Sequence, residues 1–362
     1  MRISRSNTPI NQECSLFIVR EEYPDHSLYY LNLDIRSRQN IAGVMTLLYE
    51  HLQENELFIL MGFIYGLEKD FHRILPSLLS SVMILEHENK SGCQIQLICT
   101  DSNEVSVEEH GNARLSILNH YGSQLIFTSN ILPDPSNKCS DQAYDAFRQL
   151  WTFLQSDGTV HNELARTWLY LDDILDWYDT LNNVRTDSFR KQGVYDNLIP
   201  ASTGVGMKNA VNSCILMSAF SVATADKRNT IRLVNSPLQC PAVDYRSSFS
   251  RAVEINHPES KRLLVSGTAS ISASGDTLYY DDVPGQIKHT MEVVKAILSR
   301  EDYDWNNIVR AIAYFRNPED IAMFRKYCDS YGIDSNYIIL TAGTICRDEL
   351  LFEIELDAVK KL

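Results

Sequence analysis

The sequence lacks the features that define several large classes of protein. Its longest apolar run, residues 57–67, includes Gly62 and Gly66 and is too short for the roughly 20 residues of a transmembrane helix. The N-terminal residues have no apolar core typical of a secretory signal, so we expect a cytoplasmic protein with no membrane partner. Positive charge is scarce as well, because 33 Lys and Arg against 47 Asp and Glu give a net charge of −14. Since nucleic-acid binding relies on Lys and Arg that displace counterions, we expect no nucleic-acid partner.

Motifs of metal and hydrolase chemistry are missing too. None of the 8 cysteines forms a CxxC pair, and no histidines have HxxH or HExxH spacing, so the sequence indicates no metal site. A GxSxG elbow is absent, which argues against a serine hydrolase. In a reducing compartment we expect the cysteines to be free thiols, mostly buried.

What the sequence does contain is an internal repeat. Three residues of one segment recur 144 positions later, where Gln142, Arg166 and Tyr170 are matched by Gln286, Arg310 and Tyr314. Around them the apolar spacing predicts the same order of strand, helix, strand, helix and strand in each copy. The expected elements of the first copy are residues 124–130, 141–154, 162–171, 173–182 and 214–222, and those of the second copy are 262–271, 285–298, 306–315, 319–330 and 349–356.

This order predicts an α+β fold, with a sheet and two helices on one of its faces in each copy. We expect two tandem α/β sandwich domains, residues 107–232 and 233–362, and an additional N-terminal α/β region, residues 1–106. In that region residues 29–35 and 93–99 alternate like strands, while 41–52 and 70–85 are expected to be helical. A degenerate third copy is one interpretation of it.

The last strand of the second copy carries charges on a segment otherwise suited to burial. Because side chains alternate along a strand, we expect Arg347, Glu353 and Glu355 on one face and Cys346 on the other. Burial beside apolar residues would raise the pKa of a glutamate and make it a general acid. The alternative is that this face of the sheet meets solvent, with its carboxylates paired to Lys or Arg.

Two further segments are candidates for ligand contacts. Residues 199–206 offer two glycines and two hydroxyls to an anion, or they form a structural turn. The irregular segment 236–251 joins the two copies, and its Arg246 and Arg251 could clamp a carboxylate or serve only as surface charge.

The chain resembles the Rid (YjgF) superfamily and, within it, the chorismatases. The repeated Gln-bearing helix, the Arg-x-x-x-Tyr strand and the closing Glu-Ile-Glu strand are similar to Rid domains, which implies Rid-like, chorismate mutase-like sandwich domains. The motifs similar to chorismatases are Arg166-Thr-Trp, Pro200-Ala-Ser-Thr-Gly-Val-Gly206, Ser248-Phe-Ser-Arg-Ala252, Ser266-Gly-Thr-Ala-Ser-Ile271 and Cys346-Arg-x-x-Leu-Leu-x-Glu353.

The resemblance implies a cofactor-independent enzyme that cleaves chorismate, or a related dicarboxylate enol ether, with release of pyruvate. Glu353 would protonate the enolpyruvyl methylene, and Cys346 resembles the type that makes 3-hydroxybenzoate. The small anionic substrate would be bound between the repeats, whereas the sequence does not decide between a monomer and a homo-oligomer. The residues expected to bind the substrate are Arg166, Tyr178, Arg185, Arg251, Gly267, Arg316 and Arg347.

Departures from the family pattern leave alternatives open. The linker reads Cys240-Pro-Ala-Val-Asp-Tyr-Arg-Ser-Ser-Phe, without the Tyr-Gly-Pro associated with chorismatases. Residues 337–341 contain no arginine where Rid deaminases bind a carboxylate, which argues against imine hydrolysis. A Rid-type imine or enamine deaminase and a non-catalytic ligand-binding protein are the two alternatives.

Overall fold

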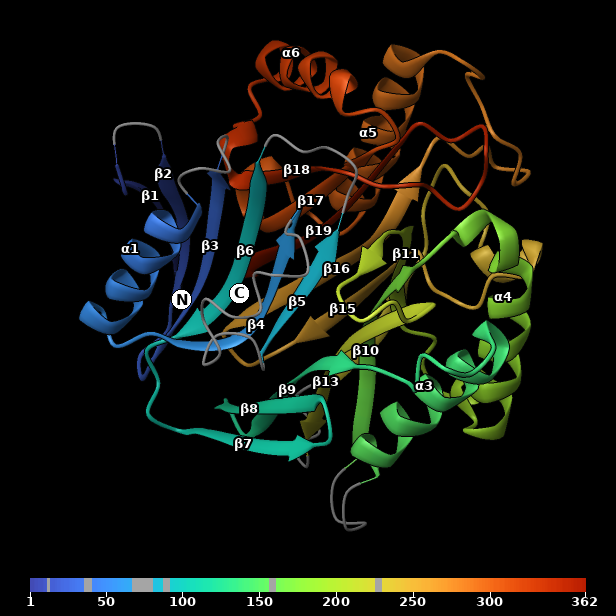
Figure 1. The fold of residues 1–362 in the computed structure, drawn as a ribbon. Coiled ribbons are helices and arrows are strands. Elements are labelled where there is room, and N and C mark those ends of the chain that lie inside the picture. The colour runs from blue at the N-terminus through green and yellow to red at the C-terminus, as the bar shows by residue number, and fades with distance from the viewer. Residues whose placement is uncertain (12–13, 36–40, 67–80, 87–91, 156–160, 225–229) are drawn as a thin grey trace.

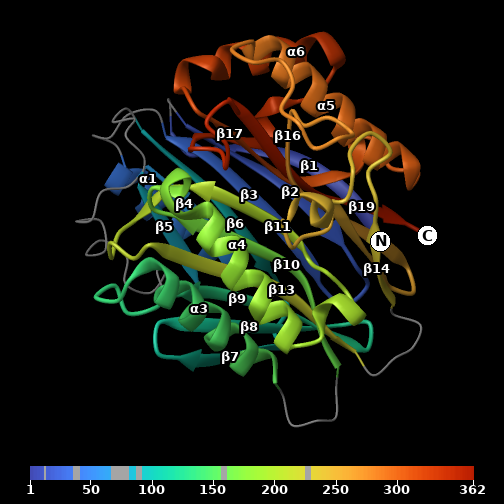
Figure 2. The same ribbon diagram turned by 90° about the vertical axis from the view of Figure 1, so that its right-hand side faces the viewer.

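The computed structural model describes residues 1–11, 14–35, 41–66, 81–86, 92–155, 161–224 and 230–362. These residues form three mixed sheets, and Figures 1 and 2 show helices on the outer faces of the sheets. The α+β class predicted from the sequence is confirmed. Among the described helices, none is both long and apolar enough to cross a membrane.

The first sheet has the strand order β1-β2-β3-β6-β4-β5, extended at the β5 edge by β12. Helix α1 (Ile41–Glu54) follows β3, and its apolar face packs on this sheet. The strands are β1 (Arg2–Pro9), β2 (Ser15–Glu22), β3 (Ser27–Ile35), β4 (Phe58–Tyr65), β5 (Val82–Glu86), β6 (Cys93–Thr100) and β12 (Lys208–Asn209).

The second sheet has the order β7-β8-β9-β13-β10-β11, and helices α3 (Cys139–Leu154) and α4 (Ile174–Lys191) cover it. Its strands are β7 (Val105–His110), β8 (Ala113–His120), β9 (Ser123–Ile131), β10 (His161–Leu171), β11 (Ala201–Gly206) and β13 (Ile215–Thr224). The third sheet has the order β14-β15-β16-β19-β17-β18 under helices α5 (Val283–Arg300) and α6 (Ile321–Tyr331). Its strands are β14 (Thr230–Val234), β15 (Ala252–Asn256), β16 (Ser260–Ala269), β17 (Ile308–Phe315), β18 (Ile338–Ala342) and β19 (Phe352–Lys361).

The three sheets therefore share one strand order, and their inner faces meet in a common core. Side chains from all three sheets form this central cluster, whereas each set of helices packs on the outer face of its own sheet. Both faces of the central strands are thus buried, which explains the continuous apolar run over residues 57–67, where β4 lies.

The repeated tyrosines lie where the sheets meet. Tyr170 of β10 and Tyr314 of β17 are 3.3 Å apart at their hydroxyls, and Tyr65 of β4 lies 2.9 Å from the first and 3.5 Å from the second. We call these three residues the tyrosine cluster. Each comes from the corresponding strand of its own sheet, so the first sheet contributes to the centre in the same way as the other two.

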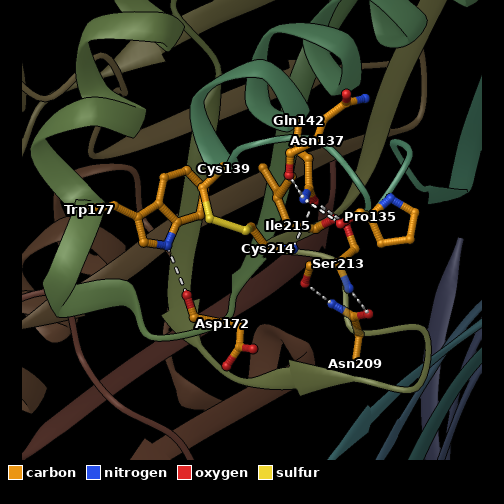
Figure 3. Close-up of a disulfide and its surroundings, with 10 residues drawn as sticks. All are labelled: Pro135, Asn137, Cys139, Gln142, Asp172, Trp177, Asn209, Ser213, Cys214 and Ile215. Atoms are coloured by element: carbon orange, nitrogen blue, oxygen red, sulfur yellow. Dashed lines mark hydrogen bonds between the residues drawn. A yellow bond between two sulfur atoms is a disulfide. The ribbon is translucent and has the colours of Figure 1, made fainter.

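The repeated glutamines tie each helix to the backbone that precedes the closing strand. Gln142 accepts hydrogen bonds from the Ser213 hydroxyl at 2.7 Å and the Cys214 N–H at 2.8 Å (Figure 3). Gln286 accepts one from the Leu351 N–H at 2.9 Å and donates one to the Glu349 carbonyl at 2.8 Å. The sequence repeat at these positions is thus a repeated structural contact.

The structure corrects one expectation beside Gln142. Cys139 at the start of α3 and Cys214 just before β13 form a disulfide, whereas we expected free thiols (Figure 3). The two Cα atoms are 5.3 Å apart, because the helix start and the strand start lie side by side. Cys99, Cys240, Cys328 and Cys346 are free thiols.

Several predicted boundaries also differ. The helix expected over 70–85 is wrong for residues 82–85, which belong to β5, and its first part, residues 70–80, lies outside the described residues. The segment 199–206 is not a turn, because its residues 201–206 form β11, parallel to β10. Ser202 and Gly204 of β11 line a cavity, so contact of this segment with an anion stays a prediction. The second and third sheets begin at Val105 and Thr230, shortly before the predicted domain starts at 107 and 233.

Candidate functional site

A cavity of about 220 Å³ lies at the junction of the second and third sheets. Its floor comes from β11, β16 and β19, and its walls come from α4, the segment before β15 and the loop before β19. Pockets for drug-sized ligands measure roughly 300–1,000 Å³, so this cavity suits a smaller molecule. Its lining residues are Tyr178, Asp179, Asn182, Arg185, Ser202, Gly204, Tyr245, Ser247, Phe249, Arg251, Gly267, Ala269, Ile271, Cys346, Arg347 and Glu353.

Glu353 is the carboxylic acid buried at the floor of this cavity. It lies near the start of β19 with only 5% of its surface exposed, so the solvent-facing alternative is wrong. Burial and the nearby Glu355 raise its pKa to about 8, although Arg251 acts in the opposite direction. At neutral pH Glu353 therefore holds a proton that it can donate.

Gly267 makes room for this carboxyl group. The register between β16 and β19 shifts between Val265 and Thr268, and the resulting bulge brings Gly267 against Glu353. A Cβ at position 267 would overlap the Glu353 carboxyl oxygen and would lie 3.4 Å from Thr203. The glycine is thus required by a close approach of side chain to backbone.

Cys346 lies on the same side of β19 as Glu353, contrary to the expected alternation. The strand begins at Phe352, so Cys346 and Arg347 belong to a loop and need not alternate. Burial and the neighbouring Glu353 raise the pKa of the Cys346 thiol to about 12. The thiol is therefore uncharged at neutral pH and can act as a weak hydrogen-bond donor beside the acid.

Three guanidinium groups surround the cavity: those of Arg185, Arg251 and Arg347. Arg185 donates to Asn182 at 2.6 Å, Arg251 donates to the Cys240 carbonyl at 3.0 Å, and Arg347 donates to the Gly275 carbonyl at 2.8 Å. Within the described parts of the chain, none of the three forms an ion pair, and the buried Nη2 of Arg251 has no hydrogen-bond partner. Neutral partners hold them in place, so their charge is available to an anion.

Aromatic rings give the cavity an apolar wall that the sequence did not single out. Arg251 lies 5.4 Å from the Tyr245 ring and 5.5 Å from the Phe249 ring, and Arg347 lies 5.4 Å from Tyr245. Both rings belong to the linker 236–251, whose polarity drew attention only to its arginines. The predicted Tyr178 of α4 also lines the cavity, and burial raises its pKa.

Two predicted substrate-binding residues lie elsewhere. Arg166 is fully buried beneath the cavity, where it pairs with Glu355 and Asp357 at 2.7 Å each, so it is not available to a substrate. Arg316 donates to the backbone carbonyls of Leu350 at 2.9 Å and Arg347 at 2.7 Å and holds the loop before β19. Arg246 lies on the outer side of the linker, in a separate groove. The prediction failed because a motif does not reveal whether an arginine already has an acidic partner.

Corresponding cavities lie at the other two sheet junctions. Each member of the tyrosine cluster pairs across its sheet with a residue that lines one of the three cavities: Tyr314 with Glu353, Tyr170 with Leu216 and Tyr65 with Gln94. Only the junction between the second and third sheets therefore has an acid at this position. No group of three or more metal-ligating side chains that could hold a metal ion occurs in the described residues.

Comparisons with known proteins agree with this arrangement. Residues 101–218 match the family model of the chorismatase FkbO/Hyg5-like N-terminal region, and residues 241–360 match the endoribonuclease L-PSP family. A chorismatase of Streptomyces hygroscopicus is 26% identical over 216 residues, which cover 53% of this chain and 60% of the relative. A 3-hydroxybenzoate synthase of the same organism is 23% identical over 275 residues, which cover 68% of this chain and 77% of the relative.

A crystal structure of a chorismatase has the same fold. It superimposes with a TM-score of 0.59 at 15% sequence identity, and the match covers 83% of this chain and 92% of the other. The match extends beyond either family model and includes much of the three-sheet arrangement. Taken together, the two family models and the curated relatives make the chain similar to the chorismatases of the Rid superfamily, and the crystal structure of a chorismatase shows the same fold.

Proposed function

We propose that this protein cleaves the enolpyruvyl ether of chorismate and releases pyruvate. The observation that carries the proposal is the protonated, buried Glu353 in a cavity whose other charged groups include three arginines without acidic partners among the described residues. Chorismate is a small dicarboxylate, so it needs cations for its carboxylates and an acid for its enol ether. The relatives named chorismatase and 3-hydroxybenzoate synthase support this substrate.

The chemistry proposed for Glu353 is general acid catalysis. Proton transfer to the methylene carbon of the enol ether makes it the methyl group of pyruvate, and positive charge develops at the adjacent carbon. Arg185, Arg251 and Arg347 are proposed to bind the substrate carboxylates, while Tyr245 and Phe249 pack against its ring. The fixed orientation of these groups lowers the reorganisation needed in the transition state.

The proposed aromatic product is of the 3-hydroxybenzoate type. The neutral Cys346 thiol lies in the same cavity as Glu353, and a cysteine at this place is what the resemblance associates with that product. One matched relative also carries the name 3-hydroxybenzoate synthase. Chorismate divides into hydroxybenzoate and pyruvate without net uptake of water.

The proposed architecture is three copies of one Rid-like unit in a single chain. The shared strand order of the three sheets and the tyrosine cluster support it, and the first sheet would then be the degenerate copy. We further propose that the protein acts in the cytoplasm, that it needs no cofactor and that its partner is the small anionic substrate.

The experiment is incubation of the purified protein with chorismate, followed by a pyruvate assay and chromatography of the aromatic product. We expect pyruvate and 3-hydroxybenzoate from the wild type, and a loss of at least about 100-fold in kcat for Glu353→Gln, the effect of removing a general acid. Glu292→Gln, on the exposed face of α5, serves as the control and retains activity. Absence of pyruvate at every pH tested would disprove the proposed reaction.

A further inference from the structure

Two glutamates of β19 have opposite surroundings. Glu353 and Glu355 are two residues apart on one face of the strand, so their Cα atoms are about 7 Å apart. Glu353 faces the cavity, whereas Glu355 lies beneath it and is completely buried. Two carboxylates this close in a buried environment are not ionised together without a large cost.

Glu355 receives four hydrogen bonds. One carboxylate oxygen accepts from Arg310 at 2.6 Å and from the Trp168 indole at 2.9 Å. The other accepts from Arg166 at 2.7 Å and from the Thr203 hydroxyl. Two of these donors are cations, so the surroundings of Glu355 favour its ionised form.

The cluster around Glu355 is balanced in charge and joins all three sheets. Arg166 and Arg310 face Glu355 and Asp357, which gives two positive and two negative groups. Gln96 of the first sheet accepts a hydrogen bond from Arg310 at 2.8 Å and thereby connects the cluster to β6. The negative charge of Glu355 is therefore held at a fixed place below the cavity.

Glu353 has a different set of neighbours. The titratable and charged groups that line its cavity are Tyr178, Asp179 and Arg185 of α4, Tyr245 and Arg251 of the linker, and Cys346 and Arg347 of the preceding loop. Among these cations Arg251 favours ionisation of Glu353, and Arg251 is already bound to a backbone carbonyl. The fixed negative charge of Glu355 acts against that ionisation.

We propose that Glu355 is a positioning residue that keeps the proton on Glu353, so that the buried Arg166–Glu355–Arg310 cluster sets the protonation state of the catalytic acid. The proposal rests on the proposed function. It assigns a role to the Arg166-Thr-Trp motif, whose arginine does not line the cavity. It also explains why Arg166 and Arg310 recur 144 residues apart while neither lines the cavity.

The pKa values agree with this division of roles. Although burial opposes it, pairing with Arg166 and Arg310 lowers the pKa of Glu355 to about 2. Burial and the charge of Glu355 raise the pKa of Glu353 to about 8. Near neutral pH one carboxyl of the pair is thus ionised, and the other is mostly protonated.

The test compares Glu355→Gln with Asp357→Asn. Both remove one negative charge and one partner of Arg166, but Asp357 lies two residues farther from Glu353 along β19. Carbon-13 NMR of the glutamate side-chain carboxyls, assigned by loss of the signal in Glu353→Gln, reports the titration of Glu353 without any need for substrate. In Glu355→Gln we expect the Glu353 titration to move down by about 1–2 pH units, and in Asp357→Asn we expect it to stay near the wild-type value.

Activity supplies a second measurement. The alkaline fall of kcat/KM for chorismate follows deprotonation of the acid, so in Glu355→Gln it should begin at a lower pH by the same amount as the NMR titration. An unchanged Glu353 titration in Glu355→Gln, or an equal shift in Asp357→Asn, overturns the proposal. If the NMR titration shifts as expected while no variant releases pyruvate, the proposed function fails but the effect of Glu355 on Glu353 is retained.

A charge-balanced double variant provides a second test of the same proposal. If Glu355→Gln does not fold, Arg310→Gln combined with Glu355→Gln removes one charge of each sign and leaves the Arg166–Asp357 pair intact. The same downward shift is expected, because Arg310 is not among the groups that shift the pKa of Glu353. A Glu353 titration at the wild-type pH in this double variant also overturns the proposal.

Discussion

At position 267 even a methyl group would occupy the space of the Glu353 carboxyl. The neighbouring Gly204 differs, because a Cβ there would meet only the Tyr178 ring, at 3.9 Å, which is an ordinary contact. Both glycines line the same cavity, and neither has a positive φ. Alanine substitutions at the two positions therefore distinguish displacement of the Glu353 carboxyl from the mere addition of a methyl group to the cavity.

We predict that Gly267→Ala lowers kcat for pyruvate release at least tenfold, because the acid must move away from the substrate, and a displacement of about 1 Å costs up to about 100-fold. Gly204→Ala should change kcat by less than about threefold, since its methyl group fits without rearrangement. Steady-state kinetics of the two variants test this. Equal effects at both positions would contradict the specific role assigned to Gly267.

Among single residues, motifs pointed to several that line the cavity. Glu353, Cys346, Arg251 and Gly267 could be found because motifs mark them, and all four line the cavity. Arg166 was assigned to the substrate from an equally clear motif, yet Glu355 and Asp357 bind it. Whether a guanidinium is free depends on side chains that lie 189 residues away or more in the chain, and spacing along the sequence carries no information on such contacts.

At the scale of elements, Gln142 and Gln286 make the same kind of contact in two sheets, so substitutions of the two glutamines can be compared. Gln286 holds the backbone at Glu349 and Leu351, next to the loop that carries Cys346 and Arg347. Gln142 makes the corresponding contact with the Cys214 N–H in the second sheet, where the disulfide lies beside it. The same kind of bond therefore supports the site in one sheet and only the fold in the other.

We predict that Gln286→Ala destabilises the protein by about 1–3 kcal/mol, since it leaves buried backbone groups without partners, and that it also lowers kcat/KM. Gln142→Ala should lower the stability by a similar or smaller amount and leave kcat/KM close to the wild-type value. Chemical denaturation and steady-state kinetics measure the two effects. A normal kcat/KM in Gln286→Ala would contradict a role for this glutamine in holding the loop before β19.

The helices and strands were predictable where their spacing is periodic. Helices α3 and α5 were found because apolar side chains recur at helical spacing, and they begin within two residues of the predicted starts at 141 and 285. The β5 strand was mistaken for helix, because a short apolar segment buried on both faces has no alternation. The loop before β19 was mistaken for strand, and this error placed Cys346 on the wrong face.

At the scale of the whole molecule, the repeat generates three similar junctions of which one carries an acid. Leu216 and Gln94 occupy the positions that correspond to Glu353 at the other two. The net charge of −14 therefore says little about the site, because three arginines line this one cavity together with Glu353 and Asp179. The sequence did not predict that the first sheet forms junctions like those of the other two sheets. The reason is that Tyr65 alone preserves the repeated pattern there.

The three sheets also meet at a cluster of histidines. His26 and His257 lie in the turns that join β2 to β3 and β15 to β16, and His120 is the last residue of β8, next to the turn into β9. Ring nitrogens of His26 and His120 are 3.1 Å apart, and the rings of His120 and His257 pack edge to face at 4.6 Å. Both ring nitrogens of His257 are buried without a hydrogen-bond partner in the described residues. The other charged or titratable groups near the cluster are Glu21, Tyr23, Asp25, Asp101, Glu104, Tyr121, Glu259 and Arg262.

Burial lowers the pKa of all three histidines, and that of His257 falls to about 4. Between pH 6.5 and 4 the unfolded chain therefore binds a proton at His257 that the folded protein does not, so stability falls as the pH decreases. Glu353 has the opposite sign, because its raised pKa makes the folded state bind the extra proton between pH 4.5 and about 8. The two contributions can be separated only by variants.

We predict that His257→Gln loses less stability than the wild type between about pH 7 and pH 4.5, with a difference on the order of 2 kcal/mol, because the variant has no histidine to protonate on unfolding. Urea denaturation at both pH values measures it. His110→Gln, which replaces an exposed histidine of β7, is the matched control for the substitution itself. The same pH dependence in His257→Gln and the wild type would contradict the prediction, and it would mean that the acid sensitivity of the folded state arises away from the turns where the three sheets meet.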